Sequence, residues 1–163
     1  AGAAGIIFPM INSRLQITEL INNSIWPPKG SRGVGFSRAS LHGKLFSQQQ
    51  RFAERPFFVA MIENSKAMEN IQDIVSTPNL DAIMIGPYDL SASLGVVGEF
   101  SSRKYKDALQ KIKEISITSK MPIGIHVIKP SKVEFDKAIN DGYQFIAYST
   151  DALFILESSK FPN

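Results

Sequence analysis

The sequence contains no cysteine among its 163 residues. Disulfide bonds, thiolate metal ligands and cysteine nucleophiles are therefore excluded. No apolar run approaches the ~18 residues that a membrane-spanning helix needs, so we expect no membrane contact. Acidic and basic residues nearly balance, 15 against 18, and no basic block is interleaved with aromatic side chains. Nucleic acid is therefore not an expected partner.

A secretion signal is also missing, which makes the cytoplasm the default location. The chain does not begin with methionine, and residues 5–9 already have the pattern of a buried strand. We therefore expect the chain to begin inside a domain. Its length fits one domain over residues 1–163, and the hydrophobic fraction of 44% is typical of globular proteins that bury a core.

Short apolar runs alternate with amphipathic helical stretches along the chain. This alternation is typical of βα units around a parallel sheet, and it predicts an α/β fold. The predicted strands cover residues 5–9, 57–62, 80–85, 122–127 and 143–148.

The helices between these strands have recognisable ends. Apolar residues at three- and four-residue spacing predict helices over 64–76 and 102–120. Ser131 and Glu134 have the spacing of a capping box and predict a helix that stops near Gly142. The last predicted helix covers 152–160, with Asp151 as its cap.

One connection is longer than βα links usually are. Residues 26–38 contain two prolines and three glycines, and a polar, glutamine-rich stretch continues to residue 54. The glycines do not follow a strand, so they do not form a dinucleotide-binding fingerprint. We interpret this segment as a surface or intersubunit loop, with a phosphate-binding loop as the alternative.

Two acidic residues come after neighbouring predicted strands. Glu63 follows strand 57–62 directly, and Asp89 follows strand 80–85 by four residues. Because parallel strands end at one edge of a sheet, both carboxylates should lie on the same rim. Magnesium-type ions bind one or two carboxylates and complete their shell with waters and substrate oxygens. The spacing alone fits two interpretations equally: a metal site, or acids that only cap the following helices.

The turn between strand 80–85 and the following helix has the sequence Gly86-Pro87-Tyr88-Asp89. Gly86 ends the strand, and Pro87 has no amide hydrogen. The amides of Tyr88 and Asp89 would then be free to bind an anion such as a substrate carboxylate. The alternative is a plain turn into a helix.

Residues 59–95 closely resemble the HpcH/HpaI aldolase family, the class II pyruvate aldolases that include 2,4-dihydroxyhept-2-ene-1,7-dioate aldolase. The resemblance rests on Met-Ile-Glu63 and on Asp81-Ala-Ile-Met-Ile-Gly-Pro-Tyr-Asp89-Leu-Ser-Ala-Ser-Leu-Gly95, and it extends over essentially the whole chain. It implies a (β/α)8 TIM barrel of which about five βα units, strands 4 to 8, are present. The chain would be the C-terminal part of such a barrel, lacking the first three units. The family usually forms trimers or hexamers, which implies a homo-oligomer.

The resemblance further implies a divalent-metal-dependent aldolase, a carbon–carbon lyase that cleaves 4-hydroxy-2-oxo acids to pyruvate or a related 2-oxo acid and an aldehyde. Glu63 and Asp89 would bind Mg²⁺, Mn²⁺ or Co²⁺. Met61, Gly86, Pro87, Tyr88 and Asp89 would contact the substrate, although Met61 stands where the family often has a glutamine and cannot donate a hydrogen bond. The family's catalytic His, Asp and Arg would fall before Ala1.

Two other functions stay open. One is an acyl-CoA lyase like the citrate lyase β-subunit, and the other is a non-catalytic half barrel that assembles with another chain. His126, at the end of a predicted strand, and His42, in the long loop, are the only histidines. Each could replace the missing base, but a hydrogen bond in the barrel mouth or a surface position is the simpler interpretation. Residues 149–151 have no histidine beside them and are assigned to helix capping.

Overall fold

The computed structural model of the chain describes residues 3–44, 46 and 55–159. Five parallel strands form one sheet in which the spatial order follows the chain order. They are β1 (Gly5–Phe8), β2 (Phe57–Ile62), β3 (Ala82–Ile85), β4 (Ile123–Val127) and β5 (Phe145–Tyr148). Each predicted strand is present. A sheet wound in one direction without a reversal is typical of a (β/α) barrel, and this chain supplies five strands of it.

The inner strands β2 and β3 are apolar on both faces because both of their faces are covered. In β2, Phe58, Ala60 and Ile62 belong to the main core between the sheet and the helices. Val59 and Met61 point to the opposite face, where they join a smaller cluster with Ala82 and Met84 of β3. Two-sided burial explains why these strands appear in the sequence as continuous apolar runs.

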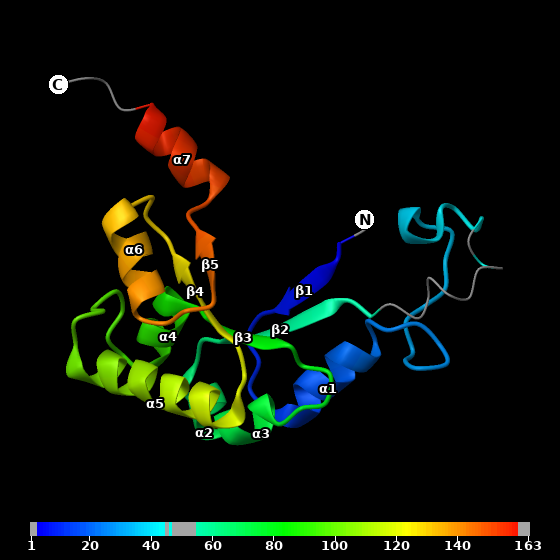
Figure 1. Ribbon diagram of the computed structural model, residues 1–163, viewed down its shortest axis with the longest axis horizontal. Helices are drawn as coiled ribbons and strands as arrows, with labels where there is room; N and C mark the ends of the chain where they lie inside the picture. Colours follow the sequence, from blue (N-terminus) through cyan, green and yellow to red (C-terminus); the bar gives the residue numbers. More distant parts are fainter. Residues whose placement is uncertain (1–2, 45, 47–54, 160–163) are drawn as a thin grey trace.

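The helices follow the strands in alternation. They are α1 (Arg14–Asn22), α2 (Ser65–Glu69), α3 (Ile71–Val75), α4 (Pro87–Ser93), α5 (Arg103–Ser119), α6 (Lys132–Asn140) and α7 (Asp151–Ser158), with a short 3₁₀ turn, η1 (Arg38–Ser40). Helices α1, α2, α3 and α5 lie on one side of the sheet (Figure 1). Within the ranges that the structure describes, no helix is both long enough and apolar enough to cross a membrane.

The helix predicted over 64–76 is wrong in one respect, because two short helices replace it. The break is at Asn70, whose side-chain amide donates to the carbonyl of Asn12 in the loop after β1, at 2.8 Å. The apolar spacing continues across the break, so the pattern alone does not reveal it.

The predicted caps are partly right. Ser131 Oγ accepts from the Glu134 amide at 3.3 Å, as predicted. The return bond of a capping box does not form, because the Ser131 amide donates to the Lys129 carbonyl. Thr150, rather than Asp151, caps the last helix by accepting from the Leu153 amide. That helix ends at Ser158, and residue 160 lies outside the described residues.

Several apolar parts of the fold are left uncovered. In the described residues, β1 and β5 each have one unpaired edge. Helix α7 extends away from the other helices (Figure 1), with Phe154, Ile155 and Leu156 exposed. In the long loop, a Cβ at Gly33 or Gly35 would meet no atom within 4 Å. This open space agrees with a surface loop, and residues 47–54 of that connection lie outside the described residues.

Candidate metal and substrate site

The register of β2 and β3 places the two ends of these strands side by side. Ile62 pairs with Ile85, so Glu63 and Gly86 are the next residues along each strand. A Cβ on Gly86 would lie 2.5 Å from Glu63 Oε2 and 2.9 Å from Glu63 Cβ. Gly86 therefore provides the space that the Glu63 carboxylate occupies, a role beyond ending the strand.

Glu63 is a buried acid, with 4% of its surface exposed to solvent. Its Oε1 accepts a hydrogen bond from the amide of Met10 at 2.6 Å, which ties the loop after β1 to the end of β2. Burial raises the pKa of Glu63, the Met10 amide partly opposes this, and the negative charge of Asp89 raises it further. In the part of the chain that the structure describes, no basic side chain pairs with Glu63.

Asp89 reaches the same rim from the first turn of α4. Gly86 is the N-cap of this helix, Pro87 is its first residue, and the Leu90 amide donates to the Gly86 carbonyl at 2.9 Å. Among the described residues, the amides of Tyr88 and Asp89 have no hydrogen-bond acceptor. These two amides are thus available to an anion at the rim, as the turn sequence predicts.

Helix capping does not account for Glu63. The side chain that caps α2 is that of Asn64, whose Oδ1 accepts from the Ala67 amide at 2.8 Å. The alternative that Glu63 is only a cap is therefore wrong. Asp89 does lie in the first turn of α4, where the helix dipole stabilises its charge, and this position is compatible with a second role.

Two serines fix α4 in place, and the sequence gives little sign of them. Ser93 Oγ accepts from the Ser65 amide at 2.8 Å, which joins the end of α4 to the start of α2 just after Glu63. The fully buried Ser91 donates to the Tyr88 carbonyl and accepts from the Gly98 amide. The two candidate metal ligands therefore sit on segments that are bonded to each other.

The donor set fits a hard divalent ion. Glu63 and Asp89 offer only oxygen ligands, and the charge of Asp89 acts on a buried Glu63 that no cation offsets. Among the residues described, no cluster of three or more His, Asp or Glu could hold a metal. Two carboxylates are a normal protein contribution to a magnesium site, and waters and substrate oxygens complete it. Softer ions that prefer nitrogen or sulfur would find fewer ligands here.

The other residues that the sequence singles out lie on three different segments. Met61 is half-buried on β2, and its sulfur lies 3.4 Å from where a Gly86 Cβ would be. His126 is at the rim on β4, and its Nε2 lies 3.2 Å from the carbonyl oxygen of Ser149. His42 is in the turn after η1, where its amide donates to the Ser37 carbonyl.

A parallel sheet wound in one direction, with carboxylates after neighbouring strands at one rim, is typical of part of a (β/α) barrel. The family model described as HpcH/HpaI aldolase/citrate lyase matches residues 1–156. The chain belongs to this family, which confirms the resemblance seen in the sequence.

Known relatives agree with this assignment. A hydroxypyruvate/pyruvate aldolase from Roseobacter denitrificans is 30% identical over 98% of this chain and 62% of its own length. A 2-keto-3-deoxy-L-rhamnonate aldolase from Klebsiella pneumoniae is 28% identical over 96% of this chain and 59% of its own. The crystal structure of an HpcH/HpaI aldolase from Desulfitobacterium hafniense superposes with a TM-score of 0.82 at 26% identity, covering 97% of this chain and 61% of that one. The chain therefore spans about three fifths of these relatives.

Proposed function

We propose that this chain provides the metal and 2-oxo acid site of a divalent-metal-dependent aldolase. The observation that carries the proposal is the buried Glu63, whose carboxylate fills the space left by Gly86 and whose pKa the charge of Asp89 raises. The reaction is cleavage of a 4-hydroxy-2-oxo acid to pyruvate, or a related 2-oxo acid, and an aldehyde. The aldolases named among the relatives support this reaction class, while the aldehyde specificity is outside the proposal.

Each rim residue has a defined task in this scheme. Glu63 and Asp89 hold the ion, which is Mg²⁺, Mn²⁺ or Co²⁺, and the Met10 amide fixes the direction of the Glu63 carboxylate. The amides of Tyr88 and Asp89 hold the carboxylate of the 2-oxo acid, and Pro87 places the first turn without adding a competing donor. Met61 contributes apolar contact and cannot replace a hydrogen-bonding side chain. When bound, the ion supplies Lewis-acid polarisation of the 2-oxo group.

The proton acceptor is the missing part of this scheme. Cleavage requires a base that takes the proton of the C4 hydroxyl, and a group that stabilises the negative charge left on the 2-oxo acid. In the resemblance these roles belong to His, Asp and Arg residues that cannot be assigned to any position of this sequence. We therefore propose that the 163-residue chain binds metal and 2-oxo acid but lacks full retro-aldol activity by itself.

The test separates binding from cleavage. Mn²⁺ binding to the purified chain is measured by isothermal titration calorimetry, with and without pyruvate, for the wild type, Glu63→Gln and Asp89→Asn. Asp73→Asn, which neutralises an exposed acid on α3, is the matched control. Each site variant should weaken Mn²⁺ binding at least about tenfold, equivalent to 1.4 kcal/mol, and the control should not. Binding that is the same in all four proteins would refute the metal site.

A second experiment tests the missing units and the alternatives. The segment of the Roseobacter denitrificans relative that this chain does not match is expressed separately and mixed with the chain. Recovered cleavage of a 4-hydroxy-2-oxo acid is the expected result. Cleavage by the 163-residue chain alone would overturn the proposed division of the site. Cleavage of a coenzyme A thioester instead of the 2-oxo acid would favour the acyl-CoA lyase, and assembly without either activity would favour the half barrel.

A further inference from the structure

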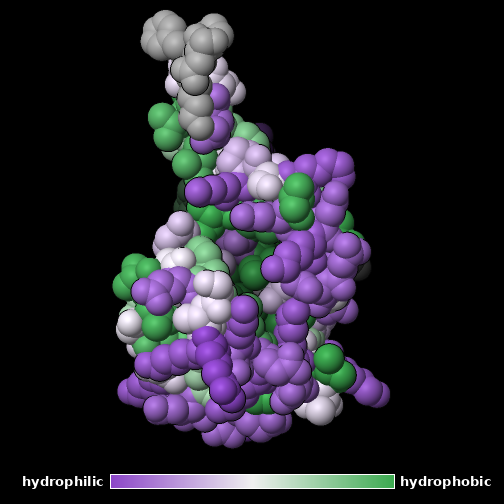
Figure 2. Space-filling model, turned by 90° about the vertical axis from the view of Figure 1, so that its left-hand side faces the viewer, coloured by the Kyte–Doolittle hydropathy of each residue, from purple (hydrophilic) through white to green (hydrophobic). Residues whose placement is uncertain are grey.

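A cavity borders the candidate site: Glu63 and Asp89 do not line it, but Pro87 and Tyr88 at the start of α4 do. It has a volume of about 430 Å³ and is enclosed by α5, α6 and the end of β4, on the helix side of the sheet. This size is within the ~300–1,000 Å³ range of small-molecule sites. The face shown in Figure 2 is hollowed at this place, with hydrophobic side chains on the floor and hydrophilic side chains at the rim.

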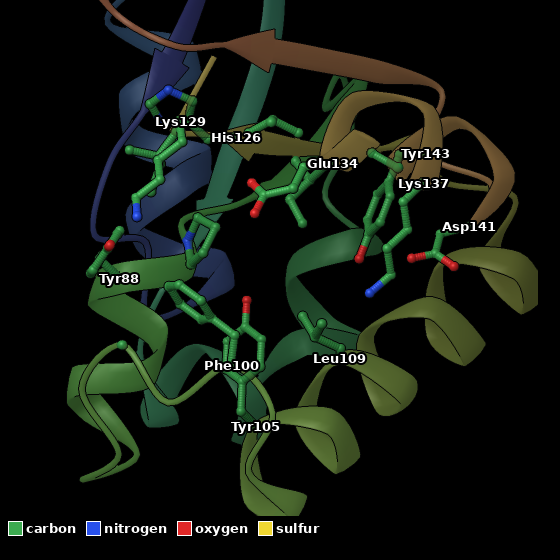
Figure 3. A pocket seen from close by; sticks show the side chains of 16 residues that line it. Tyr88, Phe100, Tyr105, Leu109, His126, Lys129, Glu134, Lys137, Asp141 and Tyr143 are labelled. Atoms are coloured by element: carbon green, nitrogen blue, oxygen red, sulfur yellow. The ribbon is translucent and has the colours of Figure 1, made fainter. Parts of the chain in front are cut away.

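Two tyrosine hydroxyls point into this cavity. Tyr105 on α5 is 3% exposed and Tyr143, just before β5, is 7% exposed. Figure 3 shows both phenol oxygens directed into the same space. No hydrogen bond of either hydroxyl is formed within the described residues, and neither oxygen is among the buried atoms that lack a partner, so both oxygens are open to the cavity. Two phenol hydroxyls that open into one cavity can both donate to an acceptor that an occupant brings.

Both hydroxyls carry their protons at physiological pH. Burial raises the pKa of Tyr105 to about 12. Burial also raises the pKa of Tyr143, and the nearby Tyr105 and Asp141 raise it further. The two groups are therefore neutral and can act as donors to a ligand oxygen.

Two ammonium groups and two carboxylates line the cavity. Lys129 and Lys137 face Glu134 and Asp141 around the cavity, and neither lysine forms an ion pair within the described residues. A third ammonium group, on Lys113, lies over the ring of Tyr143 at 4.6 Å from its centroid. Since Lys129 and Lys137 have no ion-pair partner within the described residues, either ammonium group can pair with an anionic group of a ligand.

One wall of the cavity suits a flat apolar group. The ring of Phe100 packs against those of Tyr88 and Tyr105, with centroid separations of 5.1 Å and 5.3 Å. Leu109 and Ala138 complete the apolar lining on α5 and α6. A six-membered ring can rest against these side chains while its polar substituent reaches the hydroxyls.

We propose that this cavity binds a small monocarboxylic acid that carries an aromatic or alicyclic ring. The carboxylate accepts from the hydroxyls of Tyr105 and Tyr143 and lies near Lys137, and the ring lies against Phe100. The site needs no metal and does not depend on the aldolase reaction.

The test uses the purified chain with EDTA present and follows ligand titrations by NMR. Benzoate and cyclohexanecarboxylate are the probes, and benzamide and benzylamine test the need for a carboxylate. Both acids should bind, with the amide and the amine at least about tenfold weaker. Tyr105→Phe and Tyr143→Phe each remove one hydrogen bond to a charged carboxylate, so each should weaken benzoate binding by roughly 12–160-fold. Ala138→Phe should fill the cavity and abolish binding.

The matched control is Tyr148→Phe, which removes a tyrosine hydroxyl on β5 outside the cavity and should leave benzoate binding unchanged. The tyrosine variants keep their rings, so the test remains valid if Ala138→Phe does not fold. The proposal is overturned if neither acid binds at millimolar concentration. It is also overturned if benzylamine binds better than benzoate, or if both cavity tyrosine variants bind benzoate as the wild type does.

Discussion

The Gly86→Ala substitution tests the candidate metal site with a single methyl group. The added Cβ would lie 2.5 Å from Glu63 Oε2, and ordinary contact begins near 3.4 Å, so the carboxylate must retreat by about 0.9 Å. Such a shift would stretch or break the 2.6 Å bond from the Met10 amide to Glu63 Oε1. A hydrogen bond to a charged group contributes about 1.5–3 kcal/mol, and repacking can recover part of it. We expect a loss of about 1–3 kcal/mol in unfolding free energy.

The same shift displaces a proposed metal ligand, so Mn²⁺ binding should weaken about tenfold or more. Urea unfolding followed by circular dichroism measures the stability, and titration calorimetry measures the Mn²⁺ affinity. Gly35→Ala is the matched control, because a Cβ at that position meets no atom within 4 Å. If Gly86→Ala keeps both the stability and the Mn²⁺ affinity of the wild type, the assigned position of the Glu63 carboxylate is wrong.

Two pH-dependent predictions concern stability. Burial alone would raise the pKa of Asp81, but hydrogen bonds from Arg55 and the Phe58 amide lower it below 3.8. Its stabilisation is therefore present above pH 3.8 and is lost as the pH falls through the lower folded pKa. Asp81→Asn should lower the unfolding free energy at pH 7 by about 1–2 kcal/mol. Most of this loss should come from the bond to the Phe58 amide, because the Arg55 side chain is 38% exposed and its ion pair is screened by water. The stability of the variant should also depend less on pH during acid denaturation. Burial raises the pKa of Tyr105 from 10.0 to about 12. The stability that the protonated hydroxyl contributes is therefore fully present below pH 10 and is lost as the pH rises toward 12. Tyr105→Phe should lose less stability than the wild type over that interval in alkaline unfolding, and equal losses would contradict the burial of this hydroxyl.

The strands could be predicted because a strand in a parallel sheet has a recognisable local sequence pattern. Both faces of each inner strand are covered, so β2 and β3 appear as uninterrupted apolar runs that turn-forming residues bound. The helix break at Asn70 could not be predicted in this way. It depends on a bond to Asn12, which is 58 residues away along the chain, and the apolar spacing continues through it.

In the candidate site, too, the residues near strand ends could be predicted, while a contact between distant segments could not. Strand ends gave Glu63, Gly86 and Asp89, because parallel strands place their carboxyl ends at one edge. The contact that orients Glu63 comes from the Met10 amide, 53 residues earlier, and any residue other than proline could supply that donor. A backbone donor leaves no signature in a sequence. Packing between distant segments, rather than local preference, decides these details.

The position of His126 bears on which group acts as the base. Its Nε2 faces the Ser149 carbonyl, which can only accept, so Nε2 carries the hydrogen and only Nδ1 could take a proton. Ser149 is itself fixed, with φ at 59° and its amide bonded to the Val127 carbonyl at 2.7 Å. The ring is therefore held as part of the rim between β4 and β5, as the simpler interpretation of the sequence expects. The complementation experiment, rather than assays of the chain alone, therefore tests whether the base is His126 or a residue that another segment supplies.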